Sequence, residues 1–168
     1  GTVSKVGVIG AGFMGAGVAY VSAMAGIEVV LIDRDQEGAD KGKQFAIDEQ
    51  AKRVKRGKTT QEKAAKITDR IEATTDYKKL KGVDLIVEAV FENSVLKAKI
   101  TKMAEEVVGD DAVFGSNTST IPITDLAKAS SRPENFIGIH FFSPVHKMML
   151  VEIIKGAKTS DYAISRAI

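Results

Sequence analysis

A glycine pattern near the start of the chain constrains its fold more than any other feature. Residues 5–15 read Lys-Val-Gly-Val-Ile-Gly-Ala-Gly-Phe-Met-Gly, which gives the spacing G-x-G-x-x-G at Gly10, Gly12 and Gly15. The pattern follows a short apolar run and precedes helical spacing, so it predicts a strand, a tight turn and a helix. Such turns also occur for packing alone. In a dinucleotide site, Gly10 permits the turn, Gly12 lets the backbone approach a pyrophosphate, and Gly15 lets the helix lie close to the sheet. The turn contributes two further candidates for cofactor contact, Phe13 and Met14.

A carboxylate after a second predicted strand supports the dinucleotide interpretation. The strand spans residues 28–33, and Asp33 follows Gly15 by 18 residues, close to the roughly 20 typical of a ribose-binding carboxylate. We expect Asp33 to bind the adenosine hydroxyls and to repel the 2′-phosphate of NADP. Arg34 leaves the opposite preference open, because an arginine at this corner can hold a 2′-phosphate. The sequence favours NAD.

Composition excludes several other classes of protein. A chain of 168 residues with 44% hydrophobic content suits one domain, residues 1–168, and its net charge of +2 gives no case for nucleic acid. The absence of cysteine and the presence of only two histidines argue against disulfides, cysteine nucleophiles and a metal site. No apolar run reaches membrane-spanning length and no signal peptide is apparent. We therefore expect a soluble cytoplasmic protein, with an organellar parent trimmed of its targeting segment as the alternative.

Strand and helix patterns alternate along the chain, which is typical of an α/β fold with a doubly wound, mainly parallel sheet. The expected helices are residues 13–25 and 94–108, with a helical pair over 36–70 that is interrupted near 57–60. The expected strands are residues 4–9, 28–33, 71–74, 83–88 and 112–116, followed by β-like runs at 136–142 and 149–154. An ordinary crossover needs only about a dozen residues, so the helical pair after the second strand is an insertion.

The inserted helices are basic. Ten lysines and arginines but four aspartates and glutamates occur between residues 41 and 70. A basic helix is often simply a solvated face. The alternative is a docking surface for a polyanion, centred on residues 52–58, for which acyl-CoA with its 3′-phosphate and pyrophosphate is suitable.

Two later segments carry reactive side chains. The fifth strand ends in Ser116-Asn117-Thr118-Ser119-Thr120, which places hydroxyl and amide groups, Asn117 among them, where ligands collect in such sheets. Turn and helix-cap chemistry is the alternative. If the last two β-like runs form a hairpin, His140 lies opposite Glu152. The carboxylate would then fix the imidazole tautomer and raise its basicity, which makes His140 a competent general base. A buried histidine with a chance neighbour is the other interpretation.

Four motifs together resemble the NAD-binding domain of L-3-hydroxyacyl-CoA dehydrogenase, most closely that of the multifunctional fatty-acid β-oxidation enzymes. They are Val6-Gly-Val-Ile-Gly-Ala-Gly-Phe-Met-Gly15, Val87-Glu-Ala-Val-Phe-Glu-Asn93, Ser116-Asn-Thr-Ser119, and His140-Phe-Phe-Ser-Pro144 with Leu150-Val-Glu-Ile-Ile154. The resemblance implies a Rossmann-type fold, NAD as cofactor, and oxidation of (3S)-3-hydroxyacyl-CoA to 3-ketoacyl-CoA. It also implies that His140 is the catalytic base, that Glu152 is its carboxylate partner, and that Ser119 lies near the substrate hydroxyl.

The resemblance further implies contacts with the cofactor and with CoA. Residues matching those that line the cofactor site are Glu92, Lys97 and Ser143, the last at a position where stand-alone enzymes have an asparagine. Residues matching those that contact CoA are Ser119, Arg56 and Lys52.

The family's catalytic asparagine and dimer interface belong to a following helical domain, and the resemblance implies that this chain lacks it. The isolated domain is therefore expected to be inactive, and its parent to be a homo-oligomer or part of a β-oxidation complex. Two alternatives stay open: a non-catalytic NAD-binding or structural module, and another β-hydroxyacid dehydrogenase that uses a lysine base.

Overall fold

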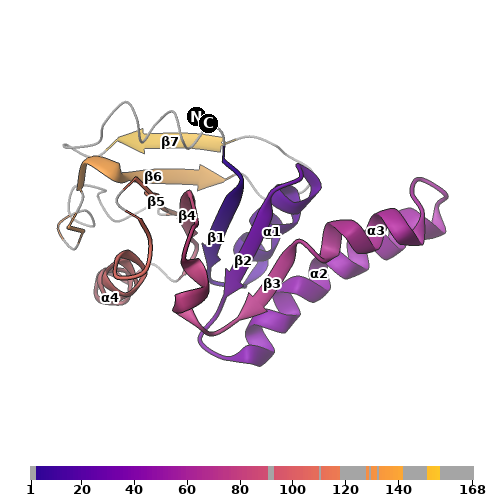
Figure 1. The fold of residues 1–168 in the computed structure, drawn as a ribbon, viewed down its shortest axis with the longest axis horizontal. Helices are drawn as coiled ribbons and strands as arrows, with labels where there is room; N and C mark the ends of the chain where they lie inside the picture. Colours follow the sequence, from indigo (N-terminus) through magenta and orange to yellow (C-terminus); the bar gives the residue numbers. More distant parts are fainter. Residues whose placement is uncertain are drawn as a thin grey trace.

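The computed structural model describes residues 3–90, 93–109, 111–117, 128, 130–131, 133–141 and 151–155. These residues form a seven-stranded sheet in the order β3-β2-β1-β4-β5-β6-β7 (Figure 1). Strands β1 to β6 are parallel, and β7 runs antiparallel to β6. The strands are β1 (Lys5–Ile9), β2 (Glu28–Ile32), β3 (Ile71–Thr74), β4 (Leu85–Glu88), β5 (Val113–Ser116), β6 (Phe136–Phe141) and β7 (Val151–Lys155).

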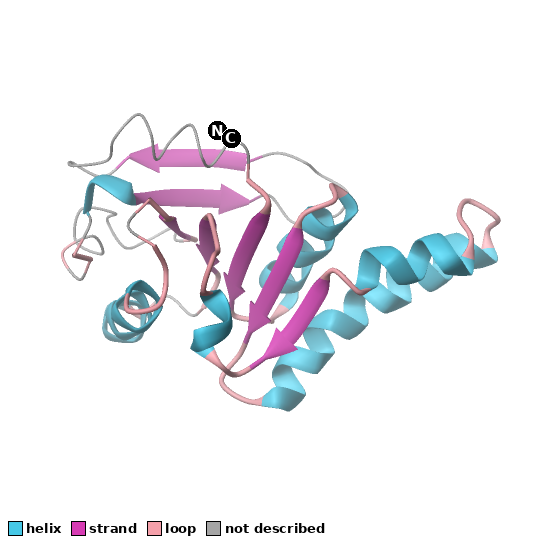
Figure 2. Cartoon of the chain, in the orientation of Figure 1, coloured by secondary structure: helices cyan, strands magenta, loops and turns pink. Residues whose placement is uncertain are grey.

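Helices cover both faces of the sheet (Figure 2). They are α1 (Phe13–Met24), α2 (Gln36–Lys55), α3 (Gln61–Thr68) and α4 (Ser94–Glu105), with short 3-10 helices η1 (Tyr77–Leu80) and η2 (Pro133–Asn135). Side-chain caps begin the helices after β2 and β4: Asp35 accepts a hydrogen bond from Gly38 N at 2.7 Å, and Asn93 accepts one from Leu96 N at 3.0 Å.

Alternating strand residues build two apolar cores, because successive side chains of a strand point to opposite faces. Val8 and Leu31 pack with α1 residues such as Ala19. Ile9 and Ile86, from the other face, pack with residues of α4 and η1. Both faces are buried, so the strands read as nearly continuous apolar runs.

The structure confirms the predicted α/β fold, with its mainly parallel sheet and the helical pair after the second strand. Several element ends differ from the predicted bounds, and hydrogen bonds of turns account for two of these differences. The fourth strand begins at Leu85 rather than at residue 83, because Val83 N closes a turn onto Leu80 O and the Asp84 carboxylate accepts hydrogen bonds from Ser4 and Lys5. The fourth helix ends at Glu105 rather than at residue 108, where Val107 N turns back to Ala104 O.

The helical pair α2 and α3 extends past the edge of the sheet near β3 (Figure 1). Among the helices that the structure describes, none combines the length and the apolar composition needed to cross a bilayer.

Candidate cofactor-binding and catalytic site

The turn after β1 contains two glycines that the fold itself requires. Gly10 has a φ of +102°, and a Cβ there would lie 2.7 Å from the carbonyl oxygen of Ala89. A Cβ on Gly15 would overlap the carbonyl oxygen of Gly10. Larger residues at either position would therefore strain the turn or push α1 away from the sheet.

Gly12 differs from its two neighbours in the motif. Its φ of −68° and ψ of −170° suit any residue, and a Cβ there would meet nothing within 4 Å. Gly12 is the N-cap of α1 and no side chain caps the helix, so the first N–H groups of α1 have no side-chain acceptor from the cap. A phosphate next to Gly12 could therefore accept hydrogen bonds from those N–H groups without meeting a Cβ. Phe13, next to it, is 60% exposed and Met14 is half-buried.

Asp33 lies just beyond the carboxyl end of β2 and is half-buried. Its Oδ1 accepts a hydrogen bond from Arg34 N at 2.8 Å. A Cβ on Gly38 would come within 2.7 Å of its Oδ2, so the glycine leaves room for the carboxylate. The Arg34 side chain is 93% exposed and lies 3.9 Å from Asp35. The Asp33 carboxylate can therefore accept hydrogen bonds from ribose hydroxyls beside the glycine turn.

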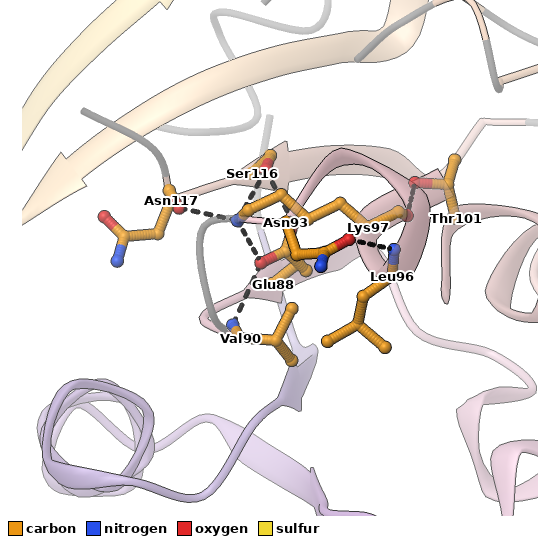
Figure 3. A network of polar contacts seen from close by, with 8 residues as sticks. All are labelled: Glu88, Val90, Asn93, Leu96, Lys97, Thr101, Ser116 and Asn117. Carbon is orange, nitrogen blue, oxygen red and sulfur yellow. Dashed lines mark hydrogen bonds and ion pairs between the residues drawn. The ribbon is translucent and has the colours of Figure 1, made fainter. Parts of the chain in front are cut away.

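A buried ion pair joins the carboxyl end of β4 to the start of α4 (Figure 3). Lys97 Nζ lies 2.7 Å from Glu88 Oε2, and the two side chains are 1% and 0% exposed. Glu88 also accepts hydrogen bonds from the Ser116 hydroxyl at 2.6 Å and from Val90 N at 3.0 Å. Lys97 Nζ donates to the carbonyl oxygen of Asn117 at 2.8 Å. The pair therefore ties three segments together at the edge of the sheet where ligands bind in such folds.

Glu88 is a residue of the site that the sequence did not single out. The available signal was a charged residue ending the apolar strand Leu85-Ile-Val-Glu88, with a lysine nine positions later in the next helix. A carboxylate at the end of a buried strand needs a partner, and Lys97 is that partner. The structure thus shows what Lys97 binds within the protein, whereas its contact with the cofactor stays a prediction.

Tyr77, in η1, is a second residue that the sequence did not single out. Burial raises the pKa of its hydroxyl above the usual value, and the negative charges of Asp33 and Glu88 raise that pKa further. The pKa of Tyr77 therefore depends on two carboxylates of the site, that of Asp33 just after β2 and that of Glu88 at the end of β4.

His140 and Glu152 occupy opposite positions in the β6–β7 pair, as the hairpin prediction requires. Gly138 pairs with Ser116, the last residue of β5. Because β5 and β6 are parallel, His140 lies two residues beyond that point, toward the carboxyl edge of the sheet. The backbone therefore places the predicted base and its partner at the same edge as the glycine turn and Asp33.

Three predicted site residues, Ser119, Glu92 and Ser143, lie outside the described residues. Lys52 and Arg56, two of the three predicted CoA contacts, are exposed at the end of α2, in the part of the helical pair that extends past the sheet (Figure 1). Lys52 lies 3.3 Å from Glu49, and Arg56 is the C-cap of α2. Contact of either residue with CoA stays a prediction.

The chain is similar to domains of known proteins. Residues 5–168 match the family model described as 3-hydroxyacyl-CoA dehydrogenase, NAD binding domain. A curated relative, the fatty acid oxidation complex subunit alpha of Idiomarina loihiensis, is 48% identical over 99% of this chain. The chain spans only 23% of that relative's length.

Two solved structures illustrate the similarity of fold. A (S)-3-hydroxybutyryl-CoA dehydrogenase from Ralstonia eutropha has a TM-score of 0.93 and 40% identity, over 99% of this chain and 59% of its own. The dehydrogenase part of a multifunctional enzyme from C. elegans has a TM-score of 0.86 and 34% identity, over 99% of this chain and 38% of its own.

Proposed function

Since the chain belongs to the family of NAD-binding domains of 3-hydroxyacyl-CoA dehydrogenases, we propose that it supplies the cofactor site and the base for oxidation of (3S)-3-hydroxyacyl-CoA to 3-ketoacyl-CoA in fatty-acid β-oxidation. The observation that carries the proposal is the position of His140 opposite Glu152, one strand from the buried end of β5. No such pair is needed for cofactor binding alone.

The order of the strands supports a particular orientation of the cofactor. The chain moves outward from β1 through β2 and β3 on one side, and from β4 through β7 on the other. A dinucleotide lies across the point where the strand order reverses. The adenosine half then lies toward Asp33, the pyrophosphate above Gly12, and the nicotinamide half toward β4 and β5.

NAD+, when bound there, supplies the hydride acceptor. His140 takes the proton of the C3 hydroxyl as the C3 hydride leaves, and the C3–O single bond becomes a carbonyl. The imidazolium that forms is stabilised by the negative charge of Glu152. We place Ser119, which follows β5, near the substrate hydroxyl, and we place Glu92, Asn117 and Ser143 along the cofactor.

The acyl-CoA substrate and the complete protein complete the proposal. The helical domain that completes the acyl-CoA cleft follows this domain in the family, so the chain alone is expected to bind NADH without useful turnover. The basic residues Lys52 and Arg56 are proposed to meet the phosphates of CoA. The complete protein is proposed to act in the cytoplasm, as a homo-oligomer or within a β-oxidation complex.

A test of the proposal replaces His140 with Gln in a protein that joins this chain to the family's helical domain. Oxidation of NADH by acetoacetyl-CoA is expected to slow by on the order of a hundredfold or more, with NADH affinity nearly unchanged. His146→Gln is the matched control, because it changes the other histidine of the chain. Near-normal turnover in His140→Gln refutes the role of base, and NADH binding without any acyl-CoA turnover in the unchanged protein favours a non-catalytic module.

A further inference from the structure

The Glu88–Lys97 pair has no part in the proton transfer described above, yet it is the most completely buried pair of charges in the described part of the chain. Burying two charges is costly unless each is compensated. Both are well compensated here, by each other and by Ser116, Val90 N and Asn117 O (Figure 3). An apolar pair would fill the same space without that cost, so the charges call for a functional explanation.

The position of the pair indicates which ligand it affects. Glu88 is the last residue of β4 and lies in register with Ile9 of β1 on one side and Ser116 of β5 on the other. Gly10, the first residue of the glycine turn, follows Ile9 directly. The pair thus lies at the reversal of strand order, on the side of β4 and β5, beneath the nicotinamide half of the proposed cofactor site.

The oxidised and reduced forms of nicotinamide differ in charge at this place. The oxidised ring carries one positive charge, whereas the reduced ring carries none. An unpaired lysine ammonium below the ring would disfavour the oxidised form, and an unpaired carboxylate would favour it. A balanced pair does neither, and it still holds the ends of β4, β5 and α4 in fixed positions.

We propose that Glu88 and Lys97 are a charge-balancing positioning pair for the nicotinamide subsite, which sets the relative affinity for NAD+ and NADH while anchoring the residues beneath the ring. Glu88 cancels the charge of Lys97 at the cofactor, and Lys97 in turn holds the carbonyl of Asn117, from which the chain continues to Ser119. The proposal rests on the proposed location of the cofactor.

The test measures the affinities of the chain for NAD+ and for NADH by calorimetry, near pH 6.5. Glu88→Gln removes the negative charge 2.7 Å from Lys97 Nζ and is expected to raise the ratio Kd(NAD+)/Kd(NADH) on the order of tenfold, which is the effect of two unit charges at a separation of about 10 Å and an effective dielectric of about 20. Lys97→Gln is expected to lower the ratio by a similar factor. The double variant is expected to return it close to the original value.

Two controls separate charge balance from structural damage. Glu72→Gln breaks the exposed pair with Lys79 and is expected to leave the ratio unchanged. Glu88→Asp keeps the charge and is expected to preserve the ratio even if both affinities weaken. Single variants that weaken NAD+ and NADH equally would show a structural role only and overturn the proposal.

The test does not require both single variants to fold. Lys97→Gln leaves Glu88 two donors, the Ser116 hydroxyl and Val90 N, so this variant decides the question alone if circular dichroism shows Glu88→Gln to be unfolded. Failure of the unchanged chain to bind either nucleotide would contradict the proposed cofactor site. Normal binding with an unmoved ratio in Lys97→Gln would contradict only the charge-balancing role.

Discussion

Replacing Gly12 and Gly15 separately with Ala distinguishes a glycine kept for the ligand from one kept for the fold. A Cβ on Gly15 would overlap the Gly10 carbonyl oxygen, whereas a Cβ on Gly12 would meet nothing within 4 Å. Gly15→Ala is therefore expected to destabilise the protein, and Gly12→Ala to weaken cofactor binding while leaving stability nearly intact.

The magnitudes follow from these contacts. Forcing α1 away from the sheet in Gly15→Ala is expected to cost about 3 kcal/mol, the upper part of the range for overpacking, which lowers Tm by roughly 6 to 12 °C in a domain of this size. For Gly12→Ala, a small loss at the N-cap is offset by the lower entropy of the unfolded chain, so stability changes by less than about 1 kcal/mol. Losing one N–H bond to a charged phosphate costs about 1.5 to 3 kcal/mol, which weakens NADH binding by about tenfold to a hundredfold.

Thermal denaturation without nucleotide measures the first effect, and NADH titration at 15 °C measures the second. Gly15→Ala should show its main loss in Tm, and Gly12→Ala should show its main loss in NADH affinity. A large fall in Tm for Gly12→Ala, or unchanged NADH affinity in that variant, would refute the inference that the open space above Gly12 is reserved for the pyrophosphate.

Three further predictions follow from single side chains. The chain should bind NADH more tightly than NADPH by roughly 2 to 4 kcal/mol, because Asp33 accepts two hydrogen bonds from the ribose as a charged acceptor. Asp33→Ala should reduce this difference in binding free energy. A preference for NADPH in calorimetry would contradict the role of Asp33. In the protein extended by the helical domain, Glu152→Gln should reduce turnover less than His140→Gln, because the glutamine keeps a hydrogen bond and loses only the charge. Unchanged turnover of Glu152→Gln in steady-state kinetics would contradict the pairing of His140 with Glu152. The raised pKa of Tyr77 means that the folded state holds its proton more tightly, so the stability it contributes is complete below about pH 10 and is lost as pH rises through the folded pKa. Urea denaturation from pH 9 to 11.5 should therefore show a shallower alkaline fall in Tyr77→Phe, and equal slopes would contradict the assignment.

Local patterns were enough to predict most of the fold. The apolar runs that became β1 and β2, the glycine turn and the break near residues 57–60 all depend on neighbours close in sequence. The pairing of His140 with Glu152 was also predictable, because a hairpin fixes which residues lie opposite each other.

Contacts between distant segments were not predictable in the same way. The partners of Glu88 come from α4 and β5, and nothing in the local pattern shows that these elements meet at its carboxylate. The spacing G-x-G-x-x-G does not distinguish among its three glycines. In the structure, a Cβ on Gly10 or Gly15 would lie too close to a backbone carbonyl oxygen, whereas a Cβ on Gly12 would meet nothing within 4 Å. The ends of β4 and α4 differed because hydrogen bonds of turns, rather than hydrophobic periodicity, decide where those elements stop.

The changes that NADH causes in the backbone amide NMR signals of the chain locate the bound cofactor. If the cofactor lies as proposed, the largest changes occur along the carboxyl edge of the sheet, at Gly12 and the start of α1, at Asp33, and at residues 88–90 and 116–117. Changes confined to the tip of the α2–α3 pair or to the amino ends of the strands would contradict this location of the cofactor.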